Sequence, residues 1–188
     1  MKIAISGLSG VGSSSTAKLV SQRVNLPMTN FTFRQLAVEK GISFEELQTQ
    51  AATNPEIDFE LDRRLIEFVN SHGDCLAATD IACWLDDAGV YGRLGLDAGA
   101  TFNLKIWLDA PLNIRAKRMH AREGGTLQQV IDYNHQRDLD NRERYLQLYG
   151  IDIFDHDRMD WVIDTSGKNL EEVVQLICDR ITKGSQAA

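Results

Sequence analysis

Residues 2–15, KIAISGLSGVGSSS, join a short apolar run to a glycine-rich segment, and the interpretation of the whole chain starts from this stretch. The apolar run over residues 2–6 predicts a buried strand. Beyond the glycines, apolar residues recur at the spacing of an amphipathic helix, at Ala17, Leu19, Val20 and Val24. The first 24 residues therefore predict a strand, a glycine loop and a helix, in that order.

The glycine-rich segment has the spacing of a phosphate-binding loop, GxxxxG followed by hydroxyl residues, with Gly7 and Gly12 as its outer glycines. In such a loop, backbone N–H groups wrap phosphates and the N-terminus of the following helix adds positive potential. A Lys and a Ser or Thr usually complete the motif. Here Ser13 occupies the Lys position, Ser14 is the candidate Mg²⁺ ligand, and a plain Gly-Ser turn is the competing interpretation. The residues expected to surround the phosphates are Gly7, Leu8, Ser9, Gly10, Val11, Gly12, Ser13, Ser14 and Ser15.

Three later apolar runs predict further buried strands, over residues 74–80, 103–110 and 159–165. Helical periodicity separates most of them. We therefore expect an α/β protein with a doubly wound parallel sheet.

Between the first two predicted strands, the sequence shows three helical patterns that form a helical insertion. Gly41 ends the first pattern, Ser43 caps the second and Pro55 opens the third. Residues 86–102, with four glycines and no clear period, predict a loop or a short helix.

A Gly-Gly pair at residues 124–125 separates two predicted helices, of which the second is capped by Thr126 and ends near Gly150. Arginines line one face of each helix, with Arg115, Arg118 and Arg122 before the break and Arg137 and Arg144 after it. Guanidinium groups bind phosphate bidentately, so the two rows could close over a triphosphate as a lid. The alternative is a solvated face with ion pairs such as Asp138 with Arg142.

Polar residues elsewhere suggest an acceptor site and a metal site. In the insertion, a guanidinium from Arg34 or Arg63 could hold an acceptor monophosphate, and a carboxylate from Asp58 or Asp62 could bind a base amino group. Surface ion pairing is the equally weighted alternative. Asp80 ends a predicted strand and could orient the waters of a Mg²⁺ ion, or simply be a turn residue.

Composition sets outer bounds on the function. The 188 residues carry a net charge of −7 and no apolar run near the roughly 20 residues needed to cross a bilayer. We therefore expect a single water-soluble domain with no membrane partner. A nucleic-acid polymer is not an expected partner either, because binding it requires a basic face. The three cysteines have neither metal-ligand nor disulfide spacing, which favours buried thiols in a reducing compartment. Gly7 interrupts the first apolar run too early for the apolar region of a secretory signal, so none is expected. The cytoplasm is the expected location.

Several segments in order resemble the archaeal-type cytidylate kinases, which are P-loop nucleoside monophosphate kinases of adenylate-kinase-like fold. The resemblance runs nearly end to end and rests on ISGLSGVGSSSTAKL, FRQLAVEKGISFEEL, NPEIDFELDRR, LKIWLDAPLNIRAKRMHARE, RERYLQLYGIDI and DWVIDTS. It implies transfer of the ATP γ-phosphoryl group to CMP or dCMP, with Mg²⁺ as cofactor. The protein is expected to be a monomer. The resemblance also implies one kinase domain over residues 1–188, whose parts are a core (1–28, 73–114 and 151–188), a monophosphate-binding insertion (29–72) and a lid (115–150).

Matched residue by residue, the resemblance implies an acceptor-phosphate contact for Arg34, a monophosphate-region role for Asp62 and Mg²⁺ binding for Ser14. The residues that it assigns to the catalytic lid are Arg118, Arg122, Arg137 and Arg144. Two segments depart from the family pattern. Ser13 replaces the Walker Lys, and Ala78, Thr79 and Asp80 stand where the family usually has Glu-Gly-Arg. A nucleotide-binding pseudokinase, or a P-loop kinase with another small acceptor, is therefore the alternative function.

Overall fold

The computed structural model describes residues 1–29 and 31–185. Asn30, which stands where the resemblance implies a glycine and was expected to keep the turn, lies outside the described residues. Its centre is a parallel sheet of β1 (Lys2–Gly7), β2 (Cys75–Ala78), β3 (Leu104–Asp109) and β4 (Trp161–Asp164) in the order β2-β1-β3-β4. β1 lies between β2 and β3, and Ile5 pairs with Ala78 on one side and Ile106 on the other. The chain passes from β1 to β2 on one side and then crosses back to β3 on the other side. The strand order therefore reverses at β1, and folds of this kind bind ligands at the carboxyl end of the strands beside such a reversal.

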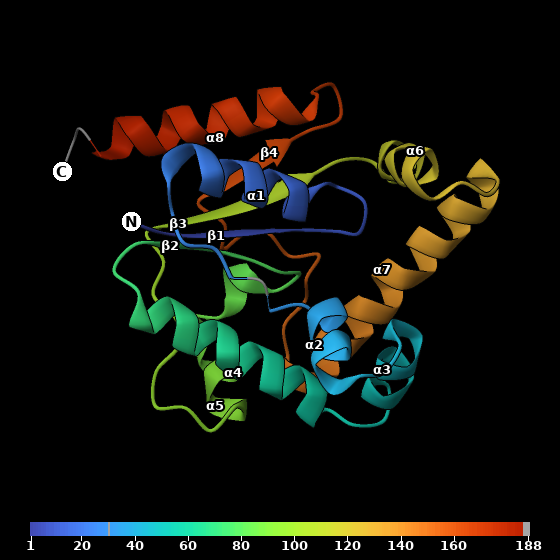
Figure 1. Cartoon of the computed structure of the whole chain (residues 1–188), viewed down its shortest axis with the longest axis horizontal. Coiled ribbons are helices and arrows are strands. Elements are labelled where there is room, and N and C mark those ends of the chain that lie inside the picture. The colour runs from blue at the N-terminus through green and yellow to red at the C-terminus, as the bar shows by residue number, and fades with distance from the viewer. Residues whose placement is uncertain (30, 186–188) are drawn as a thin grey trace.

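Helices cover both faces of the sheet (Figure 1). α1 (Ser13–Val24) and α8 (Leu170–Ser185) lie on one face, whereas α4 (Glu56–Ser71) and α5 (Ala88–Arg93) lie on the other. Ile3 and Ile5 of β1 belong to the apolar cluster with α1 and α8, and Ala4 between them belongs to the cluster with α4 and α5. Burial of both faces confirms the doubly wound parallel sheet that the apolar runs predicted.

Local capping explains the helical insertion. α2 (Phe33–Lys40) begins where the Thr32 side chain accepts the Gln35 N–H, and it ends at Gly41 with φ 68°. α3 (Phe44–Ala51) begins where Ser43 accepts the Glu46 N–H, and α4 follows Pro55. The predicted stop, cap and start are confirmed. A separate small apolar core joins the three helices through Leu36, Ala37, Leu47, Ala51, Ile57 and Leu61.

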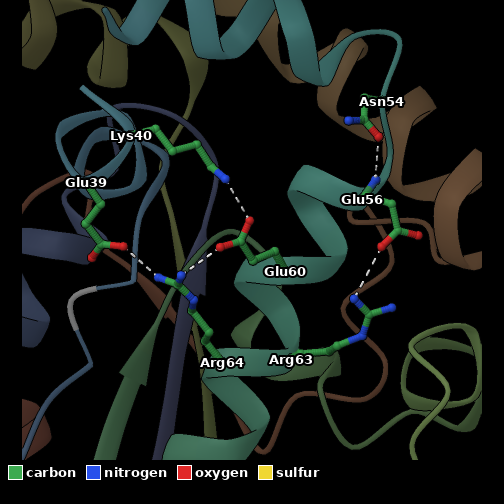
Figure 2. Close-up of polar contacts among 7 residues, drawn as sticks. All are labelled: Glu39, Lys40, Asn54, Glu56, Glu60, Arg63 and Arg64. Atoms are coloured by element: carbon green, nitrogen blue, oxygen red, sulfur yellow. Dashed lines mark hydrogen bonds and ion pairs between the residues drawn. The ribbon is translucent and has the colours of Figure 1, made fainter. Parts of the chain in front are cut away.

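Ion pairs on the outer side also hold the insertion together (Figure 2). Arg64 of α4 contacts Glu39 of α2 at 2.7 Å and Glu60 one turn back at 2.6 Å. Glu60 also accepts from Lys40 at 3.0 Å. Because these side chains are partly exposed, each pair contributes only about 0.2–1 kcal/mol.

The two arginine-bearing helices form as the sequence predicted. α6 (Leu112–Glu123) ends at Gly124 with φ 78°, and α7 (Leu127–Tyr149) starts from a capping box between Thr126 and Gln129. Gly150, with φ 73°, ends α7. The ion pair considered between Asp138 and Arg142 was wrong, because each side chain has another partner: Asp138 pairs with Arg115, which lies before it in the sequence, and Arg142 pairs with Asp152, which lies after it.

The remaining segments agree with their sequence patterns. Residues 86–102 contain the short helix α5, and a 3₁₀ turn, η1 (Ala82–Trp84), precedes it. The cysteines Cys75, Cys83 and Cys178 are free and buried. Among the described residues, none of the helices has the length and apolar character required for crossing a bilayer.

Candidate active site

A cavity of about 390 Å³ opens at the carboxyl edge of the sheet, beyond the end of β1. Five parts of the chain form its walls: the glycine loop, the starts of α2 and α3, the segment after β2, the inner side of α6 and α7, and the turn between β4 and α8 with the start of α8. Its position agrees with the switch point of the strand order. All nine residues of the predicted phosphate loop, from Gly7 to Ser15, line it.

Three glycines give this loop a shape that other residues could not adopt. Gly10 and Gly12 have φ values of 82° and 99°, in the left-handed region that L side chains disfavour. A Cβ on Gly7 would lie 2.6 Å from the Leu108 carbonyl oxygen of β3. Gly12 caps α1, so the first free N–H groups of that helix face the cavity. The loop can therefore offer backbone amides to an anion.

Positive charge enters the cavity from elements other than the loop. Arg34 of α2, Arg122 of α6, Arg137 of α7 and Lys168 before α8 all line it. The Arg34 guanidinium lies 4.4 Å from the centre of the Phe44 ring, which holds it at the start of α3. The charge that a Walker Lys would supply at Ser13 is thus distributed over several distant segments.

Asp80 is the acidic residue that the sequence placed in this site, and it does line the cavity, two residues beyond β2. Its Oδ2 accepts a hydrogen bond from Asn141 Nδ2 at 3.3 Å. Burial raises the pKa of Asp80, the nearby Arg137 guanidinium lowers it, and Asp138 raises it again. Asp80 and Arg137 are therefore electrostatic neighbours inside one cavity.

Arg118 lines the cavity but is held by the protein itself. It donates to the Val11 carbonyl at 3.1 Å and to Thr165 Oγ1 at 2.9 Å. Further bonds run to the carbonyls of Thr165 at 2.5 Å and Lys168 at 3.4 Å. Burial lowers the pKa of this guanidinium, opposed by Asp164. The sequence placed Arg118 in a closing lid, whereas in the structure it ties α6 to the phosphate loop and to the β4–α8 turn.

Three other predicted residues lie outside the cavity lining, in a buried cluster between α4 and α7. Arg144 donates to Asp58 Oδ1 at 3.1 Å and to the Ala51 carbonyl at 3.2 Å. Asp62 accepts from the Tyr149 hydroxyl at 2.5 Å. Asp58 is 3% exposed and Asp62 is 6% exposed. The sequence left surface ion pairing open for Asp58 and Asp62. In the structure Asp58 instead pairs with Arg144 and Asp62 accepts from Tyr149, and both carboxylates are buried.

Arg63 also lies away from the cavity. Its Nε donates at 3.0 Å to the carbonyl of Leu94, the residue that ends α5. Its Nη1 donates to Glu56 at 3.3 Å (Figure 2). Neighbouring residues of one helix point in different directions, so the adjacent Asp62 is buried while Arg63 reaches outward.

The sequence analysis did not predict that the turn between β4 and α8 would line the cavity. The lining residues in this turn are Thr165, Lys168 and Asn169, and Leu170 and Val173 of α8 continue the wall. A usable signal was present, because this turn follows a buried parallel strand and leads into a helix, and all such turns meet at one edge of the sheet.

The buried Asp62 predicts a pH-dependent stability. Burial raises the pKa of Asp62 from 3.8 to about 7, partly opposed by the Tyr149 hydroxyl. The folded state therefore binds more protons than the unfolded state between about pH 4 and pH 7, and the free energy of unfolding falls as pH rises. We expect a loss of about 2 to 3 kcal/mol from this group between about pH 5 and pH 8.

Urea unfolding of Asp62→Asn measured across this pH range should show a flatter profile than the wild type. Glu67→Gln, which removes an exposed carboxylate from the same helix, is the matched control and should keep the wild-type slope. An Asp62→Asn profile as steep as the wild type would exclude Asp62 as the source.

Comparison with known proteins agrees with this geometry. Residues 2–167 match the model of the cytidylate kinase-like family. The chain is 37% identical to a cytidylate kinase of Pyrococcus horikoshii, covering 93% of this chain and 85% of that protein. It is 33% identical to cytidylate kinase 2 of Borrelia garinii, covering 97% of both chains.

Solved structures support the fold. A shikimate kinase from Bacteroides thetaiotaomicron superposes with a TM-score of 0.62 at 13% identity, covering 97% of this chain and 98% of that one. A deoxyadenosine kinase from M. mycoides gives 0.63 at 15% identity, covering 97% of this chain and all of that one. At these identities the likeness is one of fold, the α/β P-loop kinase fold. The family model spans most of the chain and the sequence identity to the Pyrococcus protein extends over nearly all of it, so this chain belongs to the cytidylate kinase-like family.

Proposed function

We propose that this protein is an ATP-dependent nucleoside monophosphate kinase that transfers the γ-phosphoryl group to CMP or dCMP. The observation that carries the proposal is the glycine loop at the start of α1, which opens into a cavity with cationic side chains from other segments. Relatives named cytidylate kinase support the choice of acceptor. Direct in-line transfer needs alignment and charge neutralisation more than acid or base chemistry, and this cavity supplies both.

In this proposal each part of the cavity has one task. The loop amides hold the ATP phosphates, and Arg122 and Arg137 neutralise charge on the moving phosphoryl group. Arg34, at the start of the insertion, holds the acceptor phosphate. The cavity lies where the core (1–28, 73–114 and 151–188), the insertion (29–72) and the lid (115–150) meet, and the insertion and the lid close it and exclude water.

Mg²⁺ fits the donors that the cavity offers. Ser14 and Asp80 both line it, and a hydroxyl and a carboxylate are the hard oxygen ligands that Mg²⁺ takes. Among the described residues, no group of three or more His, Cys, Asp or Glu side chains could hold a metal alone. This agrees with a Mg²⁺ ion that is held by one or two protein oxygens together with substrate phosphates and water. When bound, the ion would neutralise phosphate charge.

We further propose that the protein works in the cytoplasm as a monomer. Three free buried thiols suit a reducing compartment. Gel filtration at several protein concentrations tests the monomer, because a dimer would elute at twice the mass.

One experiment tests the activity. ADP release from Mg-ATP is measured with CMP, dCMP, UMP and AMP offered in turn, beside a calorimetric titration of ATP alone. Turnover with CMP or dCMP well above the others is expected. ATP binding without turnover on any monophosphate would contradict the proposal and favour a pseudokinase or another acceptor.

Asp80 gives a sharper test of the acceptor and metal sites. In metal-free buffer, Asp80→Asn should tighten CMP binding about 3- to 10-fold, because it removes a negative charge close to the phosphate. With Mg-ATP, the same change should raise the Mg²⁺ concentration for half-maximal activity about tenfold, since one ligand is weaker. Asp140→Asn, on the exposed side of α7, is the matched control. Unchanged CMP affinity and Mg²⁺ requirement in Asp80→Asn would remove Asp80 from both sites.

A further inference from the structure

Two arginines of α6 hold the phosphate loop through its backbone carbonyls. Arg115 Nη1 donates to the Ser9 carbonyl at 2.8 Å, and Arg118 Nη1 donates to the Val11 carbonyl at 3.1 Å. The two arginines are three residues apart and so lie on one face of the helix. These bonds occupy two carbonyl acceptors of the loop and none of its N–H donors.

Arg115 is buried and paired, in contrast to a cation of a closing lid. It is 5% exposed, and its Nη1 lies 2.8 Å from Asp138 Oδ2 of α7. Its Nε donates to the Ala110 carbonyl at 2.9 Å. Burial raises the pKa of Asp138, which is 3% exposed, and Arg115 and the Ser9 backbone oppose that rise. A buried charge pair of this kind persists only with such additional bonds.

The loop and α6 are also in close packing contact. A Cβ on Gly10 would lie 2.9 Å from the Arg115 carbonyl oxygen and 3.0 Å from Met119 Sδ. The loop therefore has no space to move toward α6. The Ser9 and Val11 carbonyls are held on that side. Two loop N–H groups also have protein partners, Ser9 with Asp138 and Val11 with the Leu8 carbonyl, and the N–H groups at the start of α1 remain for an anion.

Asp138 connects this support to the cavity. Arg137, the preceding residue of α7, lines the cavity beside Asp80. Because consecutive helical residues differ by about 100° in direction, anchoring Asp138 against Arg115 sets the rotation of α7 that points Arg137 inward. The Arg115–Asp138 pair thus contacts the phosphate loop directly, and through the backbone of α7 it sets the direction of the Arg137 guanidinium.

We propose that Arg115 and Asp138 are positioning residues that set the phosphate loop and Arg137 relative to each other for ATP binding and phosphoryl transfer. The inference rests on the proposed function, because it assumes that the loop holds ATP. Neither residue touches the substrate; both act through Ser9 and Arg137. Their loss should affect nucleotide affinity and kcat even where the fold is kept.

The test separates positioning from stability by replacing both members of the pair. Apolar replacement of a buried ion pair is often neutral or stabilising, so Arg115→Met/Asp138→Leu should fold with a Tm close to wild type. We expect its calorimetric Kd for ATP to rise at least about tenfold and its kcat to fall at least about tenfold. Arg142→Met/Asp152→Asn, which removes a partly exposed Arg–Asp pair anchored on the same helix, is the matched control and should change both less than about twofold.

A second variant keeps the inference testable if the double variant fails to fold. Arg115→Lys retains the charge but provides one ammonium in place of a branched donor group, so Asp138 keeps its partner while the Ser9 carbonyl loses its bond. Its Kd for ATP should rise about fivefold, with circular dichroism unchanged. ATP affinity and kcat within about twofold of wild type in a folded variant would overturn the proposal. Wild-type protein that binds ATP without phosphorylating CMP would contradict only the proposed function, because the ATP titrations still report on the loop.

Discussion

Replacing Arg137 with methionine is expected to lower kcat by about 100- to 1,000-fold while the KM for ATP changes less than about threefold. Arg137 lines the cavity, and within the described part of the chain no hydrogen bond or ion pair holds its guanidinium. Its neighbours are the Asp80 and Asp138 carboxylates, which act on it electrostatically. A cation in this position can turn to the transferring phosphoryl group without first breaking a bond within the protein.

Two further variants serve as a control and a conservative replacement for Arg137→Met. Lys117→Met removes a positive charge from the exposed side of α6, outside the cavity lining, and should leave kcat unchanged. Arg137→Lys keeps the charge without the planar fork and should recover part of the rate. Steady-state kinetics with saturating CMP measure all three. A kcat for Arg137→Met equal to that of Lys117→Met would mean that the residue takes no part in transfer.

Replacing Gly10 with alanine is expected to raise the Kd for ATP at least about 100-fold and to destabilise the fold by about 2 to 4 kcal/mol. Gly10 has φ 82°, a conformation that costs a residue with a Cβ about 1–2 kcal/mol. The added Cβ would also meet the Arg115 carbonyl oxygen at 2.9 Å. The loop must shift, and loss of two amide contacts to phosphate at ~1.5 kcal/mol each accounts for the affinity change.

Gly92→Ala is the matched control, because Gly92 lies in α5 and a Cβ added there would meet nothing within 4 Å. That change should leave ATP affinity unaltered and raise stability by about 0.4–1 kcal/mol. Isothermal calorimetry and urea unfolding measure both quantities. ATP binding by Gly10→Ala equal to that of Gly92→Ala would show that the loop conformation is not needed for the nucleotide.

Features that depend on neighbouring residues could be predicted from the sequence. The glycine loop, the stop at Gly41, the cap at Ser43 and the break before Thr126 are properties of a few adjacent residues, and each is confirmed. Strands and helices follow from the periodicity of apolar residues, which reports burial directly. The parallel order of the sheet then follows from the alternation of these elements.

The roles of single charged residues could not be predicted in this way. Spacing places Arg115, Arg118 and Arg122 along one helix face, but it does not say which of them is buried. Arg115 is buried because Asp138 and the Ser9 carbonyl reach it from distant parts of the chain. Arg144 likewise pairs with Asp58, 86 residues earlier.

By itself the sequence determined the phosphate loop, the sheet and the helices, because local backbone preferences and apolar periodicity act over short distances. Only the tertiary structure decided which arginines face the cavity and which support the loop. A guanidinium is stable in either setting, exposed to water or buried with a carboxylate, so its environment depends on which distant groups the fold brings to it.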